Sequence, residues 1–447
     1  MEALFSSLVG GNALRRRVLR VLEETLVTGD SHRVDIHIMT FSFTDARIAA
    51  ALLDIALRRP NVSIRIIADW RQGAPAPGHQ VRRLENAGLP NLVVRYTYDQ
   101  PYRWDARRGQ LRWSYSSSRG LLHHKTLGIL LDGEPWQLVC GSFNWTTKAR
   151  EGYENVLAVS ASTDEERELM LAVEYEFEAM WCDGRITLSG EEARAHYARI
   201  LEEYRNDPAK AASTIMGIGS GSDVPLHVLT GSGDRSHTSS RPPPPGSRLN
   251  IAFSSRAVLP DSSTRGYSPR NANRRFILQK PSGRFKNVPL MLSVLALDLI
   301  GRAAAGDTLK VALYALSARV PEYGALLDAA RRGVQICVLL DAVVGRAIHR
   351  QLVEVACRES LPIEVRSANR TMHQKYVVHP QSQSVLTGTA NFSTDSSLRH
   401  SEQRLLIRDD EALVHAFVTD FDTMWARSLP VAGGQSSRVE PGPPGYC

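Results

Sequence analysis

Residues 121–131 read LLHHKTLGILL, and residues 141–146 read GSFNWT. In the second half of the chain, residues 373–378 read HQKYVV and residues 388–393 read GTANFS. Both copies hold the patterns His-x-Lys and Gly-[Ser/Thr]-x-Asn in the same order, at offsets of 250 residues (123 to 373) and 247 residues (141 to 388). Two patterns that recur at a nearly constant offset indicate an internal duplication.

Each copy is followed by an acidic residue, Glu154 in the first and Glu402 in the second. Cleavage of a phosphodiester without a metal needs a neutral nucleophile, an acid for the leaving oxygen and donors that neutralise the phosphate. Imidazole and imidazolium fill the first two roles near neutral pH, and a carboxylate behind an imidazole fixes its tautomer. If the two halves face each other, the duplicated residues therefore predict one phosphodiester site, made of His123, His373, Lys125, Lys375, Asn144, Asn391, Glu154 and Glu402.

The duplication extends upstream of these patterns. Apolar runs predict strands and helical periodicity predicts a helix between them, with strands 34–43 and 62–69 around helix 44–58, and strands 309–316 and 334–341 around helix 322–332. A helix between two apolar strands indicates a parallel pair. Further strands follow each His-x-Lys pattern, and each half closes with a helix, over 165–180 and 412–424.

The composition changes between the halves. Residues 206–275 are rich in Ser, Gly and Pro and include the run RPPPPG, a composition that buries little apolar surface. We therefore expect a first lobe over 1–205, a linker over 206–275, a second lobe over 276–430 and a flexible tail over 431–447.

The overall composition is that of an ordinary globular protein. A net charge of +7 and a pI of about 9.2 favour polyanionic partners. Five widely spaced cysteines without a C-x-x-C pattern indicate neither a disulfide framework nor a zinc site. The N-terminus is typical of an amphipathic helix rather than a signal peptide, and no stretch reaches the ~18 apolar residues of a membrane span. We therefore expect a cytoplasmic protein.

The two patterns resemble the paired motifs of the phospholipase D superfamily, over both repeats. The resemblance implies an α/β fold of two pseudo-symmetric α/β/α sandwich lobes, each with a mixed, mostly parallel sheet, and one active site at the lobe interface. It also implies a covalent phosphohistidine intermediate without metal or cofactor. We expect His123 to be the nucleophile and His373 the acid, with the lysines and asparagines holding the phosphate, the glutamates orienting the histidines, and Ser142 and Thr389 contacting the substrate.

The chain departs from the family in one respect. The family pattern continues as His-x-Lys-x4-Asp, but the matching positions hold Leu130 and Pro380. Asp132 lies two residues late, and we expect it to be a turn residue in Asp132-Gly133. The change removes no reacting group. It affects the usual support of the strand and turn behind the site, and it sets the chain apart from typical lipases of the family.

The first half contains an additional segment at about residues 94–120, between Asp69 and His123. Its interleaved aromatic and arginine side chains suit stacking on bases while following phosphates. The alternative is a surface excursion whose aromatic rings pack on their own domain. The candidate nucleic-acid contacts are Arg103, Trp104, Arg107, Arg108, Arg112 and Trp113.

Within the superfamily, the first copy is similar to bacterial endonucleases and to Zucchini-type nucleases, which carry one motif per chain and dimerise. We therefore expect a nuclease or other nucleic-acid phosphodiesterase acting on DNA or RNA, and a monomer, because both motifs lie in one chain. Two alternatives remain. One is a phospholipase D or phosphatidyltransferase acting on phospholipid. The other is a catalytically weak nucleic-acid-binding member, which the missing motif aspartate in both copies suggests.

Overall fold

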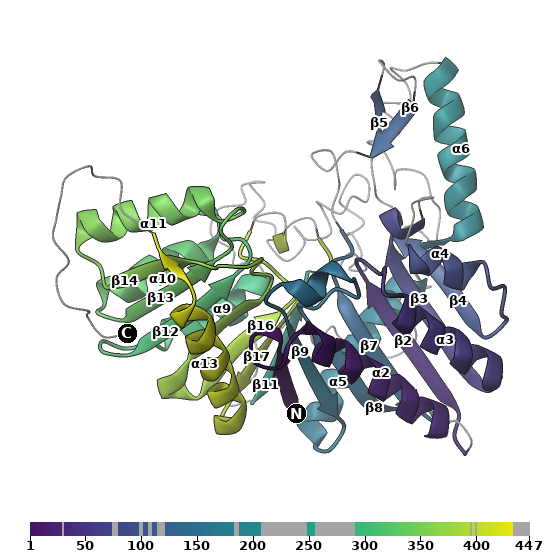
Figure 1. The fold of residues 1–447 in the computed structure, drawn as a ribbon, viewed down its shortest axis with the longest axis horizontal. Helices are drawn as coiled ribbons and strands as arrows, with labels where there is room; N and C mark the ends of the chain where they lie inside the picture. The colour runs from purple at the N-terminus through teal and green to yellow at the C-terminus, as the bar shows by residue number, and fades with distance from the viewer. Residues whose placement is uncertain are drawn as a thin grey trace, which may run out of the picture.

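The computed structural model forms two lobes that stand side by side, each built on an eight-stranded sheet (Figure 1). The structure describes residues 1–28, 31–73, 79–97, 102–105, 110–113, 121–182, 187–206, 248–254, 291–393, 396–397 and 400–431.

The two sheets correspond strand by strand. In spatial order, the strands of the first are β1 (Glu2–Phe5), β9 (Asn155–Ser160), β8 (Glu134–Gly141), β7 (Lys125–Leu131), β2 (Val34–Thr40), β3 (Val62–Asp69), β4 (Leu92–Thr97) and β10 (Thr187–Ser189). Those of the second are β11 (Leu249–Phe253), β17 (Gln403–Arg408), β16 (Ser384–Gly388), β15 (Lys375–His379), β12 (Thr308–Leu313), β13 (Gln335–Leu340), β14 (Ile363–Ser367) and β18 (Leu429–Pro430).

Helices fill the connections between these strands. The first lobe has α1 (Ser6–Val9), α2 (Gly11–Thr28), α3 (Ala46–Arg58), α4 (Gln80–Glu85), α5 (Asp164–Cys182) and α6 (Gly190–Asn206). The second has α9 (Met291–Gly301), α10 (Pro321–Arg331), α11 (Arg346–Glu359) and α13 (Glu411–Ala426). The β-α-β units and the closing helices lie where the sequence patterns predict them, within a few residues at each end.

Parallel pairing is confined to the β-α-β part of each sheet. Strands β2, β3 and β4 run parallel in the first lobe, as do β12, β13 and β14 in the second. The other neighbouring strands in the described sheets pair antiparallel. The sheets are therefore mixed, but the expectation that they are mostly parallel is wrong. Short turns join the first two strands after each His-x-Lys pattern, β7 to β8 and β15 to β16, and such turns connect antiparallel neighbours.

Helices cover both faces of each sheet. Along β2, Ile36 and Ile38 pack with α2, α3 and α4, whereas Met39 faces the core that includes α5. Along β12, Val311 packs with α9, α10 and α11, whereas Ala312 faces the core that includes α13. Successive side chains of a strand point to opposite faces, so each lobe is an α/β/α sandwich. The predicted fold class is confirmed in this respect.

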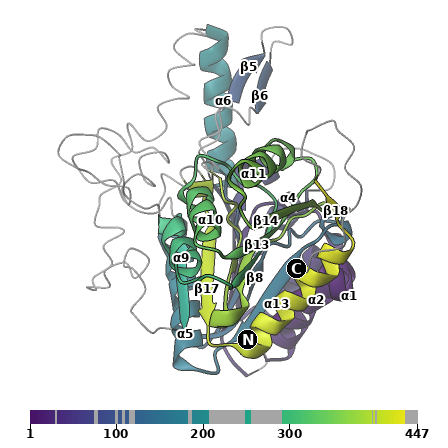
Figure 2. The same ribbon diagram turned by 90° about the vertical axis from the view of Figure 1, so that its left-hand side faces the viewer.

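One apolar core joins the two lobes. Helix α5 contacts β11 of the second lobe, and α13 contacts β1 and α1 of the first, beside which it lies in Figure 2. Phe5 of β1 packs edge-on against Phe417 of α13 with ring centroids 4.7 Å apart, and Tyr376 of β15 contacts the same ring at 5.0 Å. This shared packing fixes the geometry in which side chains of the two lobes meet.

Strand β11 lies inside the segment 206–275 that we expect to be a linker. It pairs antiparallel with β17 at the edge of the second sheet, with Leu249 opposite Ile407. The prediction of a linker is therefore wrong for residues 249–253. This apolar run of five residues is too short to stand out in a Ser/Pro-rich segment, and its partner strand is distant in sequence. Residues 207–247 and 255–275, and residues 432–447 of the expected tail, lie outside the described residues.

The N-terminus also differs from the single amphipathic helix expected. Residues 2–5 form the edge strand β1, which pairs with β9, and helices α1 and α2 follow. In the part of the chain that the structure describes, no helix has the length and apolar character needed to cross a membrane.

Candidate active site

The two His-x-Lys patterns stand at the start of equivalent strands. Strand β7 begins at Lys125 and β15 at Lys375. Residues two apart on an extended segment point the same way, so each lysine shares a side with its histidine. The Nζ of Lys125 donates a hydrogen bond to the carbonyl oxygen of His123 at 2.6 Å, and that of Lys375 donates to the carbonyl oxygen of His373. Both lysines are buried.

The two histidines face each other across the lobe interface, and each one contacts a carboxylate of the other lobe. Nδ1 of His123 lies 2.8 Å from Oε2 of Glu402, and Nδ1 of His373 lies 2.9 Å from Oε2 of Glu154. The ring centroids are 6.2 Å apart, with the rings inclined at 78°. The predicted histidines and glutamates therefore meet, in crossed pairs. Since each Nδ1 faces a carboxylate, Nε2 is the nitrogen left to react.

Backbone hydrogen bonds between the lobes fix this crossing. The N–H of His123 donates to the carbonyl oxygen of Ser401, and the N–H of His373 donates to that of Tyr153, both at 2.9 Å. Ser401 and Tyr153 directly precede the glutamate of their own lobe. Short parallel bridges join the same segments. These backbone hydrogen bonds therefore place the glutamate of each lobe next to the histidine of the other lobe.

The glycine of each Gly-[Ser/Thr]-x-Asn pattern is required by close packing. Gly141 ends β8 with φ of 144°, and Gly388 ends β16 with φ of 146°. A Cβ atom would lie 2.5 Å from the carbonyl oxygen of Asn155 at the first position and 2.3 Å from that of Gln403 at the second. Residues with a side chain rarely adopt this backbone φ, and both distances are too short for a contact between a carbon and an oxygen atom. The glycines therefore let the next residues come close to the site.

Ser142 and Thr389 are buried and brace this arrangement. The Oγ of Ser142 donates to Oε2 of Glu154 at 2.6 Å, while the Oγ1 of Thr389 accepts from the backbone N–H of Gln403 at 3.0 Å. Neither side chain has an exposed fraction above zero. That they contact substrate stays a prediction.

Asn144 and Asn391 follow in the same loops. The Oδ1 atom of each is buried and has no hydrogen-bond partner among the described residues. A native buried polar atom is normally paired, so these two amides have capacity for a partner from outside the chain. The oxygen and nitrogen of an amide exchange places when the group turns over, and either amide can then present N–H groups to a phosphate oxygen.

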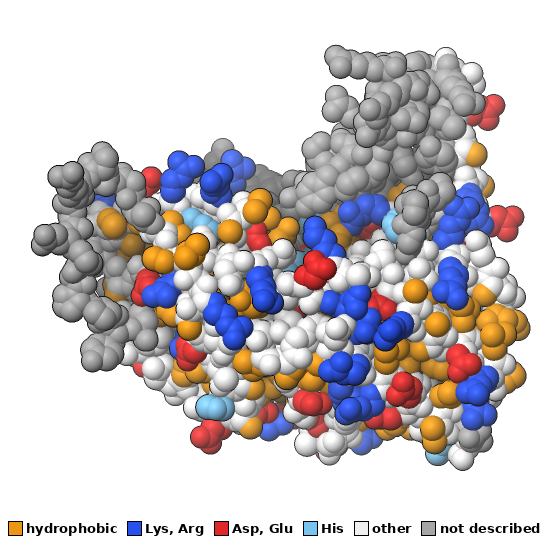
Figure 3. Space-filling model, in the orientation of Figure 1, with side chains coloured by type: hydrophobic (Ala, Val, Ile, Leu, Met, Phe, Trp, Pro, Cys, Tyr) orange, Lys and Arg blue, Asp and Glu red, His pale blue; other side chains and the backbone are white. Residues whose placement is uncertain are grey.

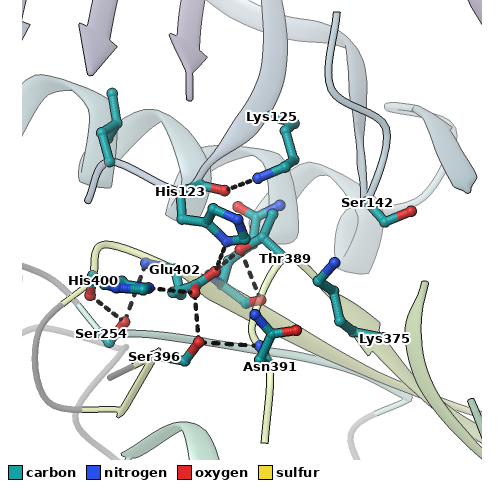
Figure 4. A network of polar contacts seen from close by, with 12 residues as sticks. His123, Lys125, Ser142, Ser254, Lys375, Thr389, Asn391, Ser396, His400 and Glu402 are labelled. Atoms are coloured by element: carbon teal, nitrogen blue, oxygen red, sulfur yellow. Dashed lines mark hydrogen bonds and ion pairs between the residues drawn. The ribbon is translucent and has the colours of Figure 1, made fainter. Parts of the chain in front are cut away.

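Glu402 has more partners than Glu154. Its Oε1 accepts a hydrogen bond from Oγ of Ser396 at 2.7 Å and lies 3.3 Å from Nδ1 of His400, while its Oε2 faces His123 (Figure 4). The sequence analysis misses Ser396 and His400 because neither belongs to the repeated patterns.

Two serines next to the edge strands hold the glutamates from behind, and the sequence analysis misses them too. The Oγ of Ser254 accepts the N–H of Glu402 at 3.1 Å, and the Oγ of Ser6 accepts the N–H of Glu154 at 2.8 Å. The sequence does hold a signal. Phe-Ser-Ser occurs at 5–7 and again at 253–255, with the offset of 248 that separates the two glutamates (154 to 402).

Two buried aspartates support the loops that carry the histidines. Oδ2 of Asp69 accepts the backbone N–H of Leu122 at 3.1 Å, and Oδ2 of Asp341 accepts that of Met372 at 3.0 Å. Leu122 and Met372 directly precede the two histidines. The support behind the site therefore does not depend on the missing motif aspartate.

The positions of the missing aspartate lie away from the histidines. Leu130 is buried near the far end of β7, and Pro380 begins a short 3-10 helix, Pro380–Ser382. Asp132 has φ of 52° and forms the turn between β7 and β8 with Gly133. The prediction that Asp132 is a turn residue is confirmed.

Burial controls the protonation of the site. It lowers the pKa of His123 well below its ordinary value and lowers that of His373, although the paired glutamates act in the opposite direction. Burial also lowers the pKa of Lys375 to about 8 and that of Lys125 well below its ordinary value. Both imidazoles are therefore mostly neutral at pH 7 before a substrate binds. A bound phosphate anion favours the charged form of the lysines.

An aromatic ring packs beside each histidine. The ring centroid of Phe41 is 4.8 Å from that of His123, and the ring centroid of Tyr314 is 5.1 Å from that of His373. The lysine Nζ atoms lie 5.0 Å and 5.2 Å from the centroids of these same rings. Each half-site therefore has one apolar wall that limits the motion of its histidine and lysine.

The two rims of the site differ in chemistry. Arg71 contacts the carboxylate of Asp69 at 2.9 Å, and its guanidinium carbon lies 4.3 Å from the ring centroid of Phe41. The equivalent position, two residues after Asp341, is Val343, whose exposed fraction is 82%. One rim thus presents a cation on an aromatic ring, and the other presents an apolar side chain.

The additional segment of the first lobe contains a hairpin of β5 (Tyr102–Asp105) and β6 (Gln110–Trp113), which lies beside α6 (Figures 1 and 2). Its contact with nucleic acid stays a prediction. The predicted contacts lie outside the described residues (Arg107 and Arg108) or have side chains that the structure does not describe (Arg103, Trp104, Arg112 and Trp113).

Among the described residues, one group has the spacing of candidate metal ligands, namely His37, Glu174 and Glu178. Arg65 donates hydrogen bonds to Nε2 of His37 at 2.9 Å and to Glu178 at 3.1 Å. A guanidinium already supplies the positive charge there. The group is an ion-pair network that packs α5 on the sheet, with no part in the histidine site.

The fold and the site together define a two-lobed protein of the phosphodiesterase type, with one half-site formed around each histidine. A family model for the cardiolipin synthase PLD-like domain matches residues 30–181 and 297–425. The chain therefore belongs to the phospholipase D superfamily. No curated protein sequence matches it.

Three solved structures resemble the chain at low sequence identity. Phosphatidylserine synthase of Haemophilus influenzae Rd KW20 is 11% identical, with a TM-score of 0.55 over 96% of this chain and 87% of that chain. The phospholipase D family member Nuc from Salmonella typhimurium is 17% identical, with a TM-score of 0.28 over 41% of this chain and 97% of that chain. Yeast tyrosyl-DNA phosphodiesterase is 10% identical, with a TM-score of 0.35 over 84% of each chain. At these identities, the likeness concerns the fold.

Proposed function

We propose that the protein is a metal-independent phosphodiesterase that cleaves nucleic-acid phosphodiester bonds through a covalent phosphohistidine intermediate. The crossed pairing carries this proposal, because each half-site holds a histidine Nδ1 within 2.9 Å of a glutamate from the other lobe. A neutral imidazole oriented in this way is a competent nucleophile. The buried lysines beside it supply the positive charge that the phosphate needs.

In the proposed reaction, Nε2 of His123 attacks phosphorus, a P–N bond forms, and the P–O bond to the leaving oxygen breaks. Protonated His373 gives its Nε2 proton to that oxygen. Neutral His373 then takes a proton from a water molecule whose oxygen attacks phosphorus. The P–N bond breaks, and His123 returns to its neutral form. Lys125, Lys375 and the two asparagine amides hold the non-bridging oxygens throughout.

The rim at Arg71 supports a nucleic-acid substrate. A guanidinium stacked on Phe41, next to His123, offers a phosphate partner and a flat surface for a base. The net charge of +7 supports the same class of substrate. Figure 3 shows Lys and Arg side chains spread over one face with Asp and Glu between them, so this support comes from the site more than from that face.

The rim at Val343 favours a second candidate, a phospholipid substrate. Val343 and Val344 are 82% and 47% exposed, and their backbone N–H groups are held by Asp341, which also holds the residue before His373. An exposed apolar rim beside the site suits an acyl chain. A phospholipase D or phosphatidyltransferase would use the same histidine chemistry.

The two candidates separate in one experiment. The protein is incubated in EDTA with labelled single-stranded DNA, duplex DNA, RNA and phosphatidylcholine vesicles. Nucleic-acid cleavage that persists in EDTA and is lost in His123→Ala supports the proposal. Headgroup release from the vesicles alone selects the second candidate. A requirement for added metal contradicts the mechanism, and tight nucleic-acid binding without product identifies a catalytically weak binding protein.

We also propose that the protein acts as a monomer in the cytoplasm. Both half-sites lie in one chain, so a second copy is not needed to complete the site. Light scattering on the purified chain tests the oligomeric state.

A further inference from the structure

His400 breaks the symmetry of the site. It is 6% exposed, its Nδ1 lies 3.3 Å from Oε1 of Glu402, and its ring centroid is 5.9 Å from that of His123 (Figure 4). Ser396 donates to the same oxygen at 2.7 Å. Glu402 therefore has three side-chain partners, and one of them is a second histidine.

The equivalent position in the first lobe holds a glycine instead of a histidine. The offset of the glutamates, 248 residues, places Gly152 opposite His400 (152 to 400). The backbone around the two positions is held alike, since Ser6 donates to the carbonyl oxygen of Gly152 and Ser254 to that of His400, each at 2.8 Å. The second lobe thus has the same backbone arrangement as the first, with one additional imidazole.

The carboxylate of the first lobe is correspondingly simpler. Both side-chain contacts of Glu154, from His373 and Ser142, fall on Oε2. A carboxylate that accepts more hydrogen bonds spreads its charge over more donors and attracts the proton of each one less strongly. Glu402 therefore holds a proton on His123 less firmly than Glu154 holds one on His373.

We infer that His400 is a positioning residue that shares Glu402 with His123 and thereby makes His123 the nucleophile and His373 the acid. The division of roles rests on the proposed phosphodiester chemistry. The sharing of Glu402 does not. Without His400, each half-site would carry one histidine paired with one glutamate, and the two histidines could exchange roles.

Other charged groups around the two histidines influence the same titration. They come from both lobes and remain unchanged when His400 is substituted, so a difference between variants reports on His400. Lys125, Lys375 and Glu154 act on the pKa values of the histidines, while Arg71 and Asp341 act on those of the two lysines.

The test compares His400→Leu, which removes the donor, with His400→Asn, whose amide nitrogen can take the place of Nδ1 without titrating. Histidine ring NMR of the full chain follows His123 without substrate. We expect its apparent pKa to rise by about 0.5 to 1 unit in His400→Leu and to stay at the wild-type value in His400→Asn. His400→Gly, which copies the first lobe, serves if His400→Leu does not fold. His415→Leu, at an exposed histidine of α13, is the control.

Turnover gives the second readout, with a small phosphodiester such as bis(p-nitrophenyl) phosphate. In His400→Leu, the acidic limb of the pH profile of kcat/KM should shift to higher pH together with the pKa of His123. At pH values below this pKa, kcat/KM should fall about 3- to 10-fold, and at higher pH it should equal that of the wild type. Denaturation at alkaline pH, where the P–N bond of a phosphohistidine survives, should trap the p-nitrophenyl phosphoryl group on His123 in the wild type and on both histidines in His400→Leu.

An unchanged pKa of His123 in His400→Leu and His400→Gly overturns the proposal, and so does an equal loss of activity in His400→Leu and His400→Asn at every pH. Trapped phosphate confined to one histidine in His400→Leu overturns the assignment of roles. If the wild type cleaves no nucleic acid while the NMR shift is present, the nuclease proposal fails and the coupling through His400 stands.

Discussion

At the scale of single residues, the crossed histidine–glutamate pairs should have a large effect on turnover. Substituting Glu402 or Glu154 by Gln removes the charge that holds each Nδ1–H, at distances of 2.8 and 2.9 Å. We expect either variant to lower kcat about 10²- to 10⁴-fold with little change in thermal stability, because the amide favours the wrong tautomer. Steady-state kinetics measure the loss. Glu134→Gln, an exposed side chain at the start of β8, should leave kcat unchanged.

The pH dependence of binding belongs to the same scale. Burial lowers the pKa of Lys375 to about 8, so this lysine loses its charge as the pH rises through that value. Only the cation attracts phosphate, and kcat/KM should therefore fall above about pH 8. Lys375→Arg keeps a charge at all accessible pH and should move this alkaline limb upward, whatever its effect on the maximum rate. If the alkaline limb of kcat/KM lies at the same pH in Lys375→Arg as in the wild type, a group other than Lys375 causes it.

At the scale of elements, the edge strands β1 and β11 do more than close the sheets. Each leads into a serine whose hydroxyl accepts the N–H of the nearby glutamate, Ser6 for Glu154 and Ser254 for Glu402. Replacing either serine by Ala leaves a buried N–H and a buried carbonyl oxygen without this partner, so we expect a loss of about 1 to 2 kcal/mol in unfolding free energy. Urea denaturation measures it. Ser317→Ala, in a half-buried loop after β12, is the control and should lose less.

The elements also show what sequence patterns could reveal. Apolar periodicity located β2, α3 and β3 and their counterparts β12, α10 and β13, since these are long and locally encoded. It did not reveal β11, a short run inside a Ser/Pro-rich segment. The prediction that each sheet is mostly parallel was wrong, although Asp132-Gly133 signals a turn that joins antiparallel strands.

The site was predictable to a similar extent. Residues that recur in both halves stood out by their offset. His400 and Ser396 did not, because a residue present in only one half has no second copy to mark it. The crossing of the pairs depends on how the lobes dock, which local patterns do not contain.

At the scale of the whole molecule, Asp420 of α13 lies buried where the lobes meet. Its carboxylate accepts hydrogen bonds from Ser7 of the first lobe and from Tyr376 of the second. Burial raises its pKa from 3.8 to about 7, while the hydrogen bonds from Ser7 and Tyr376 act in the opposite direction. A group whose pKa is raised by folding contributes stability at low pH that is lost as the pH rises toward the folded value.

Asp420→Asn should remove this pH dependence. The wild type loses about 1.4 kcal/mol of stability for each pH unit between 3.8 and about 7, because over this range the carboxyl is ionised in the unfolded state and neutral in the folded state. The stability of the variant relative to the wild type should therefore be about 2 to 3 kcal/mol greater at pH 8 than at pH 5. Thermal unfolding at the two pH values measures the difference. Asp422→Asn, at an exposed position of the same helix, should show no such change, and an equal gain at pH 5 would contradict the assignment.

The crossed pairs also constrain how the two copies can diverge after the duplication that produced them. The carboxylate that orients each histidine is inherited with the opposite copy, so neither copy is a complete functional unit for selection. A substitution in the second half that displaces Glu402 changes the orientation of His123. A substitution that restores this orientation near His123 has to occur in the first half. The two halves can therefore specialise only together, because each histidine–glutamate pair takes one residue from each half. His400, which contacts Glu402, adds a third side chain to one of these pairs.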